Sequence, residues 1–217
     1  MARTADKLIS NIRREVSSGI LKPGDQLEVN ALAERFGVSR TPIREAIRAL
    51  VDYGVLETRP RKGSFVRILN AKQLFDLFQV AAELEGMACR LASLSLTECS
   101  VKAIGLELAK CKKAVEKENN IEYAMANLGF HTAIHNASGN DWLIEQLRQL
   151  QINLNSYRTM PYKIRGRIQK STDEHRVICD AILSGDGDTA CNLMRDHMML
   201  QGKRLPTIIA TLEQQKK

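Results

Sequence analysis

The chain has 217 residues, of which 44% are hydrophobic, and a formal net charge of +7. This length suits one large domain or two smaller ones, and no apolar run approaches the roughly 20 residues that span a bilayer. The five cysteines are odd in number and include no C-x-x-C pair, which argues against a disulfide framework and against a thiolate zinc site. The N-terminal segment is charged throughout and does not read as a secretory signal, so a cytoplasmic location is expected.

The positive charge is concentrated near the N-terminus. Residues 1–69 hold 13 basic and 8 acidic side chains, a balance of +5, and the remainder holds 19 and 17, a balance of +2. A basic N-terminal third indicates an anionic partner, and nucleic acid is the commonest one. A solvated charged surface is the alternative that charge alone leaves open.

Apolar spacing in the first 55 residues predicts three helices. Leu8, Ile12 and Val16 recur at helical intervals, and the turn "SSGILKPGD" follows them. A second, short helix stops at Gly37. Ser39 is placed to cap a third helix, with Pro42 in its first turn, where the missing N–H is harmless. This third helix should bury its apolar face and end near Gly54.

The segment "VLETRPRKGSFVRI" has two β-type arms around "RPRKG", which predicts a small hairpin. After residue 70 the pattern is helical throughout. Helices are predicted at about 71–94, 97–117, 121–137, 141–158, 172–184 and 188–212. Ser171 and Glu174 have capping-box spacing, and the other expected caps are Thr97, Asp141 and Asp188, with Gly185 ending a helix. The expected domains are therefore 1–69 and 70–217.

A short helix, a turn with Gly37 and a longer helix make a helix-turn-helix, to which the hairpin adds a wing. The outer face of the second helix carries four polar side chains, Arg40, Thr41, Arg44 and Arg48. Arginine there can bond to guanine or to phosphate, and Ser39 and Thr41 suit phosphate near a helix N-terminus. The hairpin contributes the wing residues Arg59, Arg61, Lys62 and Gly63. Together these features predict DNA binding.

The stretch "EVNALAERFGVSRTPIREAIRALVDYGVLETRPRKGSFV" resembles the DNA-binding domain of GntR-type bacterial transcription regulators, with "GVSRTPIREAIRAL" as the specific core. The resemblance implies that Ser39, Arg40, Thr41 and Arg44 touch the operator, with the wing near Lys62 and Gly63. It also implies a homodimer on a short palindromic operator of double-stranded DNA, whose symmetry mirrors that of the protein.

Histidines occur at four positions of the second domain. Asn127 and His131 lie one helical turn apart, while His175 and His197 fall on two later helices. Three helices could thus direct three imidazoles and an amide oxygen into a bundle core, where zinc, nickel, copper or iron(II) would suit them. From spacing alone, ordinary core or surface histidines are the commoner outcome.

"LFQVAAELEGMACRLAS", "FHTAIHNASGN" and "STDEHRVICDAILSGDGDTACNLMRDHM" resemble the all-helical FCD effector domain of the FadR subfamily of GntR regulators. The resemblance implies a mainly α fold, with a winged helix-turn-helix followed by an antiparallel helical bundle. Many FCD domains bind a divalent metal through an Asp-x-x-x-His pair and two later histidines. The implied ligands here are Asn127, His131, His175 and His197, and the metal is expected to be zinc or nickel.

Two positions depart from that pattern. Asn127 replaces the usual aspartate, so the metal should be held more weakly, although three imidazoles suffice for zinc. Ala81 and Ala82 occupy the turn where many members carry an arginine, so an effector carboxylate would need the metal or another arginine. Arg158 is the candidate for effector binding, and Arg90 is a weaker one. His135 matches no ligand and is interpreted as a packing or pocket-edge residue.

The leading prediction is a dimeric transcription regulator, more often a repressor in this family, that senses a small organic acid or similar metabolite. A constitutive dimeric DNA-binding protein without effector is the first alternative. A metalloenzyme with a DNA-binding appendage is the second, but "HTAIH" offers no glutamate beside its histidines to serve as a general base. The chain is therefore not expected to be an enzyme.

Overall fold

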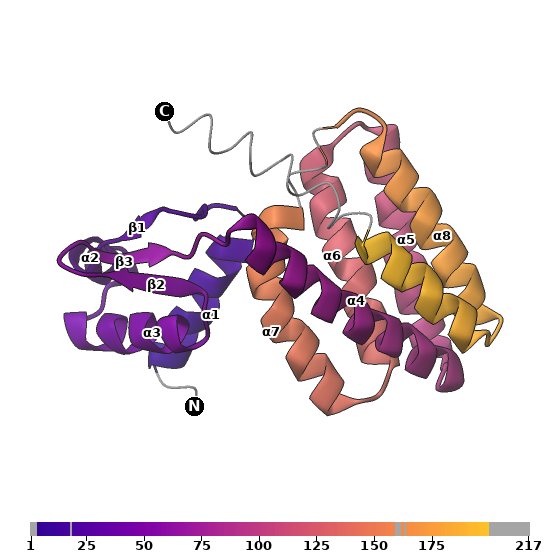
Figure 1. Ribbon diagram of the computed structural model, residues 1–217, viewed down its shortest axis with the longest axis horizontal. Helices are drawn as coiled ribbons and strands as arrows, with labels where there is room; N and C mark the ends of the chain where they lie inside the picture. Colours follow the sequence, from indigo (N-terminus) through magenta and orange to yellow (C-terminus); the bar gives the residue numbers. More distant parts are fainter. Residues whose placement is uncertain (1–3, 18, 159–161, 163, 200–217) are drawn as a thin grey trace. The chain divides into compact units, whose positions relative to one another are not determined.

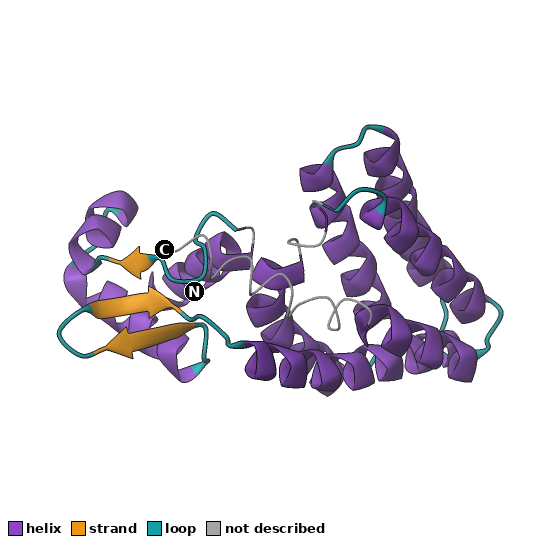
Figure 2. Cartoon of the chain, turned by 45° about the horizontal axis from the view of Figure 1, so that its top comes forward, coloured by secondary structure: helices purple, strands orange, loops and turns teal. Residues whose placement is uncertain are grey.

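The computed structural model describes residues 4–17, 19–158, 162 and 164–199, apart from the side chains of residues 17, 156 and 158. The described chain is mainly helical, with one small sheet, as predicted (Figures 1 and 2). It divides into two compact units, Met1–Leu69 with Gln149–Tyr157, and Asn70–Arg148 with Arg158–Lys217. Among the described residues, no helix is both long enough and apolar enough to cross a membrane.

The first unit contains the helices α1 (Thr4–Ser17), α2 (Val29–Phe36) and α3 (Arg40–Asp52). Leu8, Ile12 and Val16 give α1 a fully buried stripe, and α1 packs against α3. Gly37 ends α2 in the left-handed region, at φ 65°, and its backbone N–H bonds to the carbonyls of Ala33 and Glu34. A side chain other than glycine would be strained there, so the turn that aims α3 depends on this residue.

The sheet of this unit has three antiparallel strands, β1 (Gln26–Leu27), β2 (Leu56–Arg59) and β3 (Gly63–Val66), in the order β1-β3-β2 (Figure 2). The predicted hairpin is β2 and β3, in which Arg59 pairs with Gly63. The strand β1 was not predicted, because two residues are too few to show an alternating pattern. It lies against β3, with Gln26 opposite Phe65.

The last turns of a later helix complete the core of the first unit. Helix α7 covers Asp141–Arg158, and its residues Gln149–Tyr157 belong to this unit, although they fall within the predicted second domain, 70–217. Ile152 is buried in the same hydrophobic cluster as Leu8 and Ile12. Tyr157 accepts a hydrogen bond from the backbone N–H of Leu69 at 2.9 Å.

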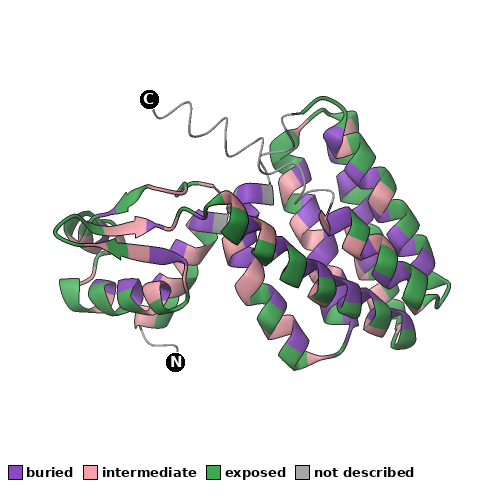
Figure 3. Ribbon diagram, viewed as in Figure 1, coloured by how far each residue is buried: buried purple, intermediate pink, exposed green. Residues whose placement is uncertain are grey.

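The second unit is a bundle of α4 (Ala71–Leu94), α5 (Glu98–Glu116), α6 (Asn120–Ala137), α8 (Arg167–Leu183) and a helix at residues 187–199. Helix α6 packs against α4 and α5, and α8 packs against the same two helices. Buried residues recur along these helices and alternate with intermediate and exposed ones (Figure 3). One predicted cap of this unit is confirmed, since Thr97 caps α5 in a capping box with Ser100.

Three predicted caps were wrong. Helix α8 begins at Arg167, so Ser171 is a buried residue inside the helix and not its cap. Asn140 accepts from the backbone N–H of Leu143 at the start of α7, which places Asp141 inside the first turn. Asp186, not Asp188, accepts from the backbone N–H of Thr189 at 3.0 Å. Asn140 and Asp186 each precede their helix by one residue, where the side-chain oxygen can reach the first free N–H groups, whereas α8 begins after Gly166 with no side-chain cap.

Candidate nucleic-acid interface and metal centre

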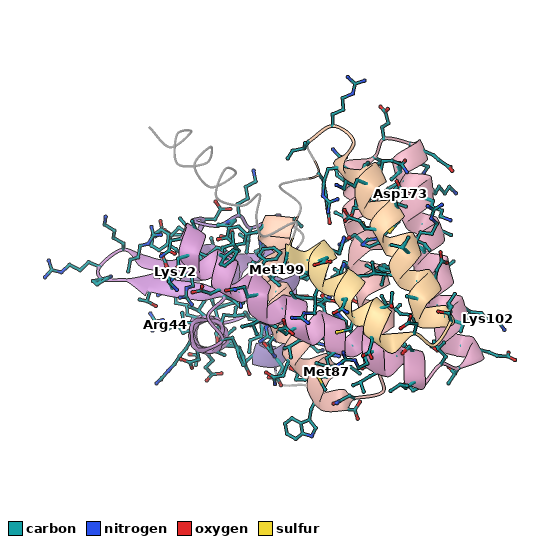
Figure 4. All side chains as sticks on the ribbon, turned by 45° about the vertical axis from the view of Figure 1, so that its right-hand side comes forward. Arg44, Lys72, Met87, Lys102, Asp173 and Met199 are labelled. Atoms are coloured by element: carbon teal, nitrogen blue, oxygen red, sulfur yellow. The ribbon has the colours of Figure 1, made fainter. Side chains whose placement is uncertain are left out.

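The predicted DNA-contacting residues of α3 all lie on its solvent side. Ile43, Ala46, Ile47 and Leu50 form the buried stripe of α3, and the polar positions fall between them. The exposed set is Ser39, Arg40, Thr41, Arg44 and Arg48. Figure 4 labels Arg44 on this helix. Ser39 has the extended backbone of an N-cap but makes no side-chain capping bond, so its hydroxyl is not committed to the helix.

The wing presents its cations in two different ways. Arg59 is half-buried, bonds to Glu57 at 2.6 Å and lies 4.2 Å above the Phe65 ring. Arg61 and Lys62 are exposed at the turn between the strands. Arg61 adopts φ 60° and Gly63 adopts φ 94°, and Gln26 donates to the Lys62 carbonyl at 2.8 Å. The turn is therefore held in a defined shape that leaves two cations free to meet an anionic backbone.

Helix α6 places Asn127 and His131 one turn apart on its buried face. His175 comes from the middle of α8, and His197 from the helix at 187–199. The three imidazoles are at most 1% exposed, and one ligand atom from each lies within 4.8 Å of the others. The Oδ1 atom of Asn127 is buried and has no hydrogen-bond partner among the described residues. The structure thus brings the three predicted histidine ligands together.

The donor set fits a divalent metal. The Nε2 atoms of His175 and His197 are 3.3 Å apart. Two nitrogens bound to one zinc at about 2.0–2.1 Å in tetrahedral geometry are also separated by roughly 3.3 Å. Phe130 stacks on the His175 ring with centroids 4.3 Å apart, which restricts that ring to its present orientation.

Two carboxylates that were not among the predicted site residues contact histidines of the second unit: Glu85, which is buried, and Glu174, which is partly exposed. Glu85 on α4 is 1% exposed, and its Oε2 lies 2.9 Å from His131 Nδ1 and 2.8 Å from His135 Nε2. Burial raises the pKa of the Glu85 carboxyl, but the charges and hydrogen bonds of the two histidines outweigh that effect and hold the pKa well below its usual range. Independently of the pKa, two imidazole nitrogens within 2.9 Å of the same oxygen are the contacts expected of a carboxylate that accepts from both.

The second carboxylate, Glu174, lies 2.6 Å from His197 Nδ1. It also accepts from the buried guanidinium of Arg167, at 3.1 and 3.3 Å. Burial raises the Glu174 pKa, and His197 and Arg167 together lower it below the ordinary value. The Arg167–Glu174 spacing of seven residues, two helical turns, was a signal that the sequence offered.

Glu85 could also have been found from the sequence. It stands on a helix face whose other members are small and apolar, since Ala81, Ala82, Ala88 and Cys89 are buried around it. A lone carboxylate in such a stripe needs a buried partner, and histidine is the partner that this helical domain supplies.

The predicted effector contacts have a different outcome. The side chain of Arg158 lies outside the described residues, so its prediction stays untested. Arg90 forms an exposed ion pair with Asp188 at 2.9 Å and does not take part in the histidine cluster. An open groove of about 1030 Å³ runs along α5 and α6, with Leu106, Met125 and Gly129 among its lining residues. None of the four predicted metal ligands lines that groove, so the groove is not part of the candidate metal centre.

Comparison with known proteins agrees with both units. The profile of the gntR family of bacterial regulatory proteins matches residues 4–66, and that of the FCD domain matches residues 76–199. The chain belongs to the GntR family and carries an FCD domain. This regulator is 32% identical over 145 residues to the HTH-type transcriptional regulator McbR of Escherichia coli (strain K12), across 67% of this chain and 66% of that protein.

Two further similarities cover more of the chain. The solved structure of E. coli McbR/YncC matches this regulator with a TM-score of 0.83 at 26% identity, over 100% of both chains. The probable D-xylose utilization operon transcriptional repressor of Paenarthrobacter nicotinovorans is 29% identical over 184 residues, 85% of this chain and 80% of that protein. The family is one of transcription regulators, which confirms the prediction that the chain is not an enzyme.

Proposed function

We propose that this protein is a ligand-responsive repressor that binds a palindromic operator as a homodimer in the cytoplasm. In this proposal it senses a small organic acid or similar metabolite through a metal held in its helical unit. The observation that carries the proposal is the cluster of three buried histidines, with ligand atoms within 4.8 Å of one another, beside the buried Asn127 oxygen. The exposed cations of α3 and of the wing support the DNA-binding part.

DNA recognition would divide between two surfaces of the first unit. Arg40, Arg44 and Arg48 on α3 can form paired hydrogen bonds with guanine or bind phosphate. Ser39 and Thr41, at the helix N-terminus, suit a phosphate, because the backbone N–H groups there also attract anions. Arg61 and Lys62 with Gly63 would follow the sugar–phosphate backbone and add affinity that does not depend on sequence. Arg59 would mainly orient the wing, because Glu57 and Phe65 hold its side chain.

Asn127, His131, His175 and His197 would hold a divalent ion, zinc or nickel by the chemistry of imidazole ligands. When bound, such an ion attracts a carboxylate to positions that the protein ligands leave open. Arg158 remains the proposed effector contact from the protein. An effector changes DNA affinity only if it binds two arrangements of the protein with different affinity, so these residues must hold it better in one arrangement.

The repressor assignment rests on what the relatives are called. One relative is named as a probable operon repressor and another as a transcriptional regulator. The homodimer belongs with the proposed palindromic operator, because such a site offers two identical half-sites and each would take the α3 of one chain.

The deciding experiment measures metal content by plasma mass spectrometry on untagged protein prepared without chelator, together with His131→Ala. We expect close to one metal per chain, lost in His131→Ala and retained in Asn136→Ala, which alters an exposed neighbour on the same helix. Binding of the same protein samples to DNA from the regulator's own promoter region is also measured. Absence of metal after reconstitution with zinc and nickel would refute the metal centre.

The sensing function is tested separately, by titrating candidate carboxylic acids into the complex of metal-loaded protein and operator. Release of the operator by one acid from the wild type, but not from His131→Ala, is the expected result. Tight operator binding that neither metal nor any acid changes would refute sensing, and would leave the constitutive DNA-binding protein as the function.

A further inference from the structure

The proposed ligands supply no negative charge to the ion they would hold. Three imidazoles bind metals in their neutral form, and the Asn127 amide is also neutral. These four side chains are between 0% and 3% exposed, so water does little to offset a double positive charge there. Burying an uncompensated charge is costly in free energy, and a stable site therefore needs an anion close by.

Glu85 meets this requirement from a fourth helix. It reaches the site from α4, whereas the histidines come from α6, α8 and the helix at 187–199. Its Oε2 accepts from His131 Nδ1 at 2.9 Å. A neutral imidazole that donates through Nδ1 has its lone pair on Nε2, so Glu85 determines which nitrogen of His131 is available to a metal.

His135 gives Glu85 a second contact. Its Nε2 lies 2.8 Å from the same Oε2 atom, and the imidazole is 2% exposed. His135 is one helical turn beyond His131 on α6, so both imidazoles meet the carboxylate from one helix face. Two donors to one oxygen fix the carboxylate in place.

Glu174 orients His197 in the same way, by a contact of 2.6 Å with Nδ1. Unlike Glu85, Glu174 is also paired with an arginine. Arg167 donates to both Glu174 oxygens, so this carboxylate brings a counter-charge with it. Because each carboxylate accepts from Nδ1 of its histidine, the Nε2 atoms of His131 and His197 are left for the site. The net negative charge that Glu174 can offer an ion is smaller, because it is shared with Arg167.

We propose that Glu85 is the anionic positioning residue of the metal centre and that His135 holds it there. Glu85 sets the tautomer of His131, and its charge offsets that of the ion next to a neutral ligand set. This inference rests on the proposed metal centre. It assigns His135, which is not a proposed ligand, a role through Glu85.

The test compares zinc affinity by chelator competition for the wild type, Glu85→Gln and Glu83→Gln. Glutamine keeps an oxygen that can accept both imidazole N–H bonds, so Glu85→Gln removes the charge and keeps the shape. We expect a dissociation constant about 10- to 100-fold higher for Glu85→Gln, the usual effect of removing an outer-shell partner. Glu83→Gln is the matched control, because Glu83 lies on the same helix in an exposed ion pair with Arg195, and its affinity should equal that of the wild type.

A second variant separates charge from structural damage. Asn127→Asp places a carboxylate directly among the ligands, so in the Glu85→Gln background it should recover at least about tenfold of the lost affinity. A Glu85→Gln protein that merely packs poorly would not be rescued in this way. Circular dichroism of each variant shows whether the helical content is unchanged.

The positioning role has its own readout, nitrogen NMR of zinc-loaded protein labelled only at histidine, since the chain has 4 histidines. His131 should carry its proton on Nδ1 and bind zinc through Nε2. Zinc on Nδ1 of His131, or two zinc ions per chain, would overturn the proposal. The second result would make Glu85, His131 and His135 a metal site themselves, because their ligand atoms also lie within 4.8 Å of one another.

The remaining outcomes separate the two proposals. Wild-type protein that takes up no zinc refutes the metal centre and the role of Glu85 with it. Wild-type protein that binds zinc no more tightly than Glu85→Gln refutes only the role of Glu85, and the metal centre stands.

Discussion

Replacing Ile152 with alanine should destabilise the DNA-binding unit, although Ile152 is more than 80 residues beyond Leu69 in the sequence. The side chain is 8% exposed and belongs to the core that includes Leu8 and Ile12. The substitution removes three carbons, a transfer loss of about 2.4 kcal/mol at roughly 0.8 kcal/mol per methylene. The cavity left behind raises the expected loss to about 3 kcal/mol, within the usual range for isoleucine to alanine.

The assay is urea unfolding followed by circular dichroism, with operator binding as a second probe that reports on this unit. Ile121→Ala is the control, because it makes the same chemical change at a side chain that is 76% exposed on α6. It should cost less than about 0.5 kcal/mol. If Ile152→Ala lost no more stability than Ile121→Ala, the last turns of α7 would not be part of this core, and the reasoning would fail.

Five further variants test other features of the described residues. Tyr157→Phe leaves the buried N–H of Leu69 without its acceptor and should lower the free energy of unfolding by about 1–3 kcal/mol in the same urea assay. Arg61→Ala should weaken binding to all DNA sequences alike and reduce the slope of log affinity against log salt by about one. Arg44→Ala should reduce the free energy of operator binding by about 1–3 kcal/mol and relax specificity at one base pair. Both are measured by fluorescence anisotropy over a series of salt concentrations. Gly86→Ala brings a Cβ to 3.0 Å from the Cys191 carbonyl oxygen and 2.9 Å from its sulfur, so it should lower the midpoint of thermal unfolding despite the better helix propensity of alanine. Gly105→Ala, with no atom within 4 Å of the new Cβ, should raise that midpoint; a fall of similar size in both variants would contradict the packing argument.

Helix positions could be read from the sequence where apolar spacing was regular, even where no cap or the wrong cap was predicted. The prediction of 71–94 matches α4 at Ala71–Leu94, where Asn70 forms a capping box with Gln73. The start of α8 was missed because Ser171 and Glu174 have capping-box spacing by coincidence inside the helix. The Glu174 side chain bonds to Arg167 and His197 instead, which a spacing rule within one segment cannot anticipate.

The candidate site was predictable only in part, for a related reason. Helical periodicity places Asn127 one turn before His131, but it cannot show that α8 and the helix at 187–199 bring His175 and His197 alongside. That expectation came from the family resemblance. The apolar face around Glu85 marks it as a buried carboxylate, but its partners could not be read from the sequence, because its contacts exist only after α4 packs against α6.

The last turns of α7 belong to the first unit, and this has a practical consequence for chimeric regulators. A hybrid made by joining residues 1–69 to the sensor of another family member would carry that member's residues where Gln149–Tyr157 now complete the core. Its recognition helix could be unchanged and its DNA-binding unit still poorly assembled. Exchanging residues 1–69 and 149–157 together, rather than joining the chains once after residue 69, would transfer the complete DNA-binding unit.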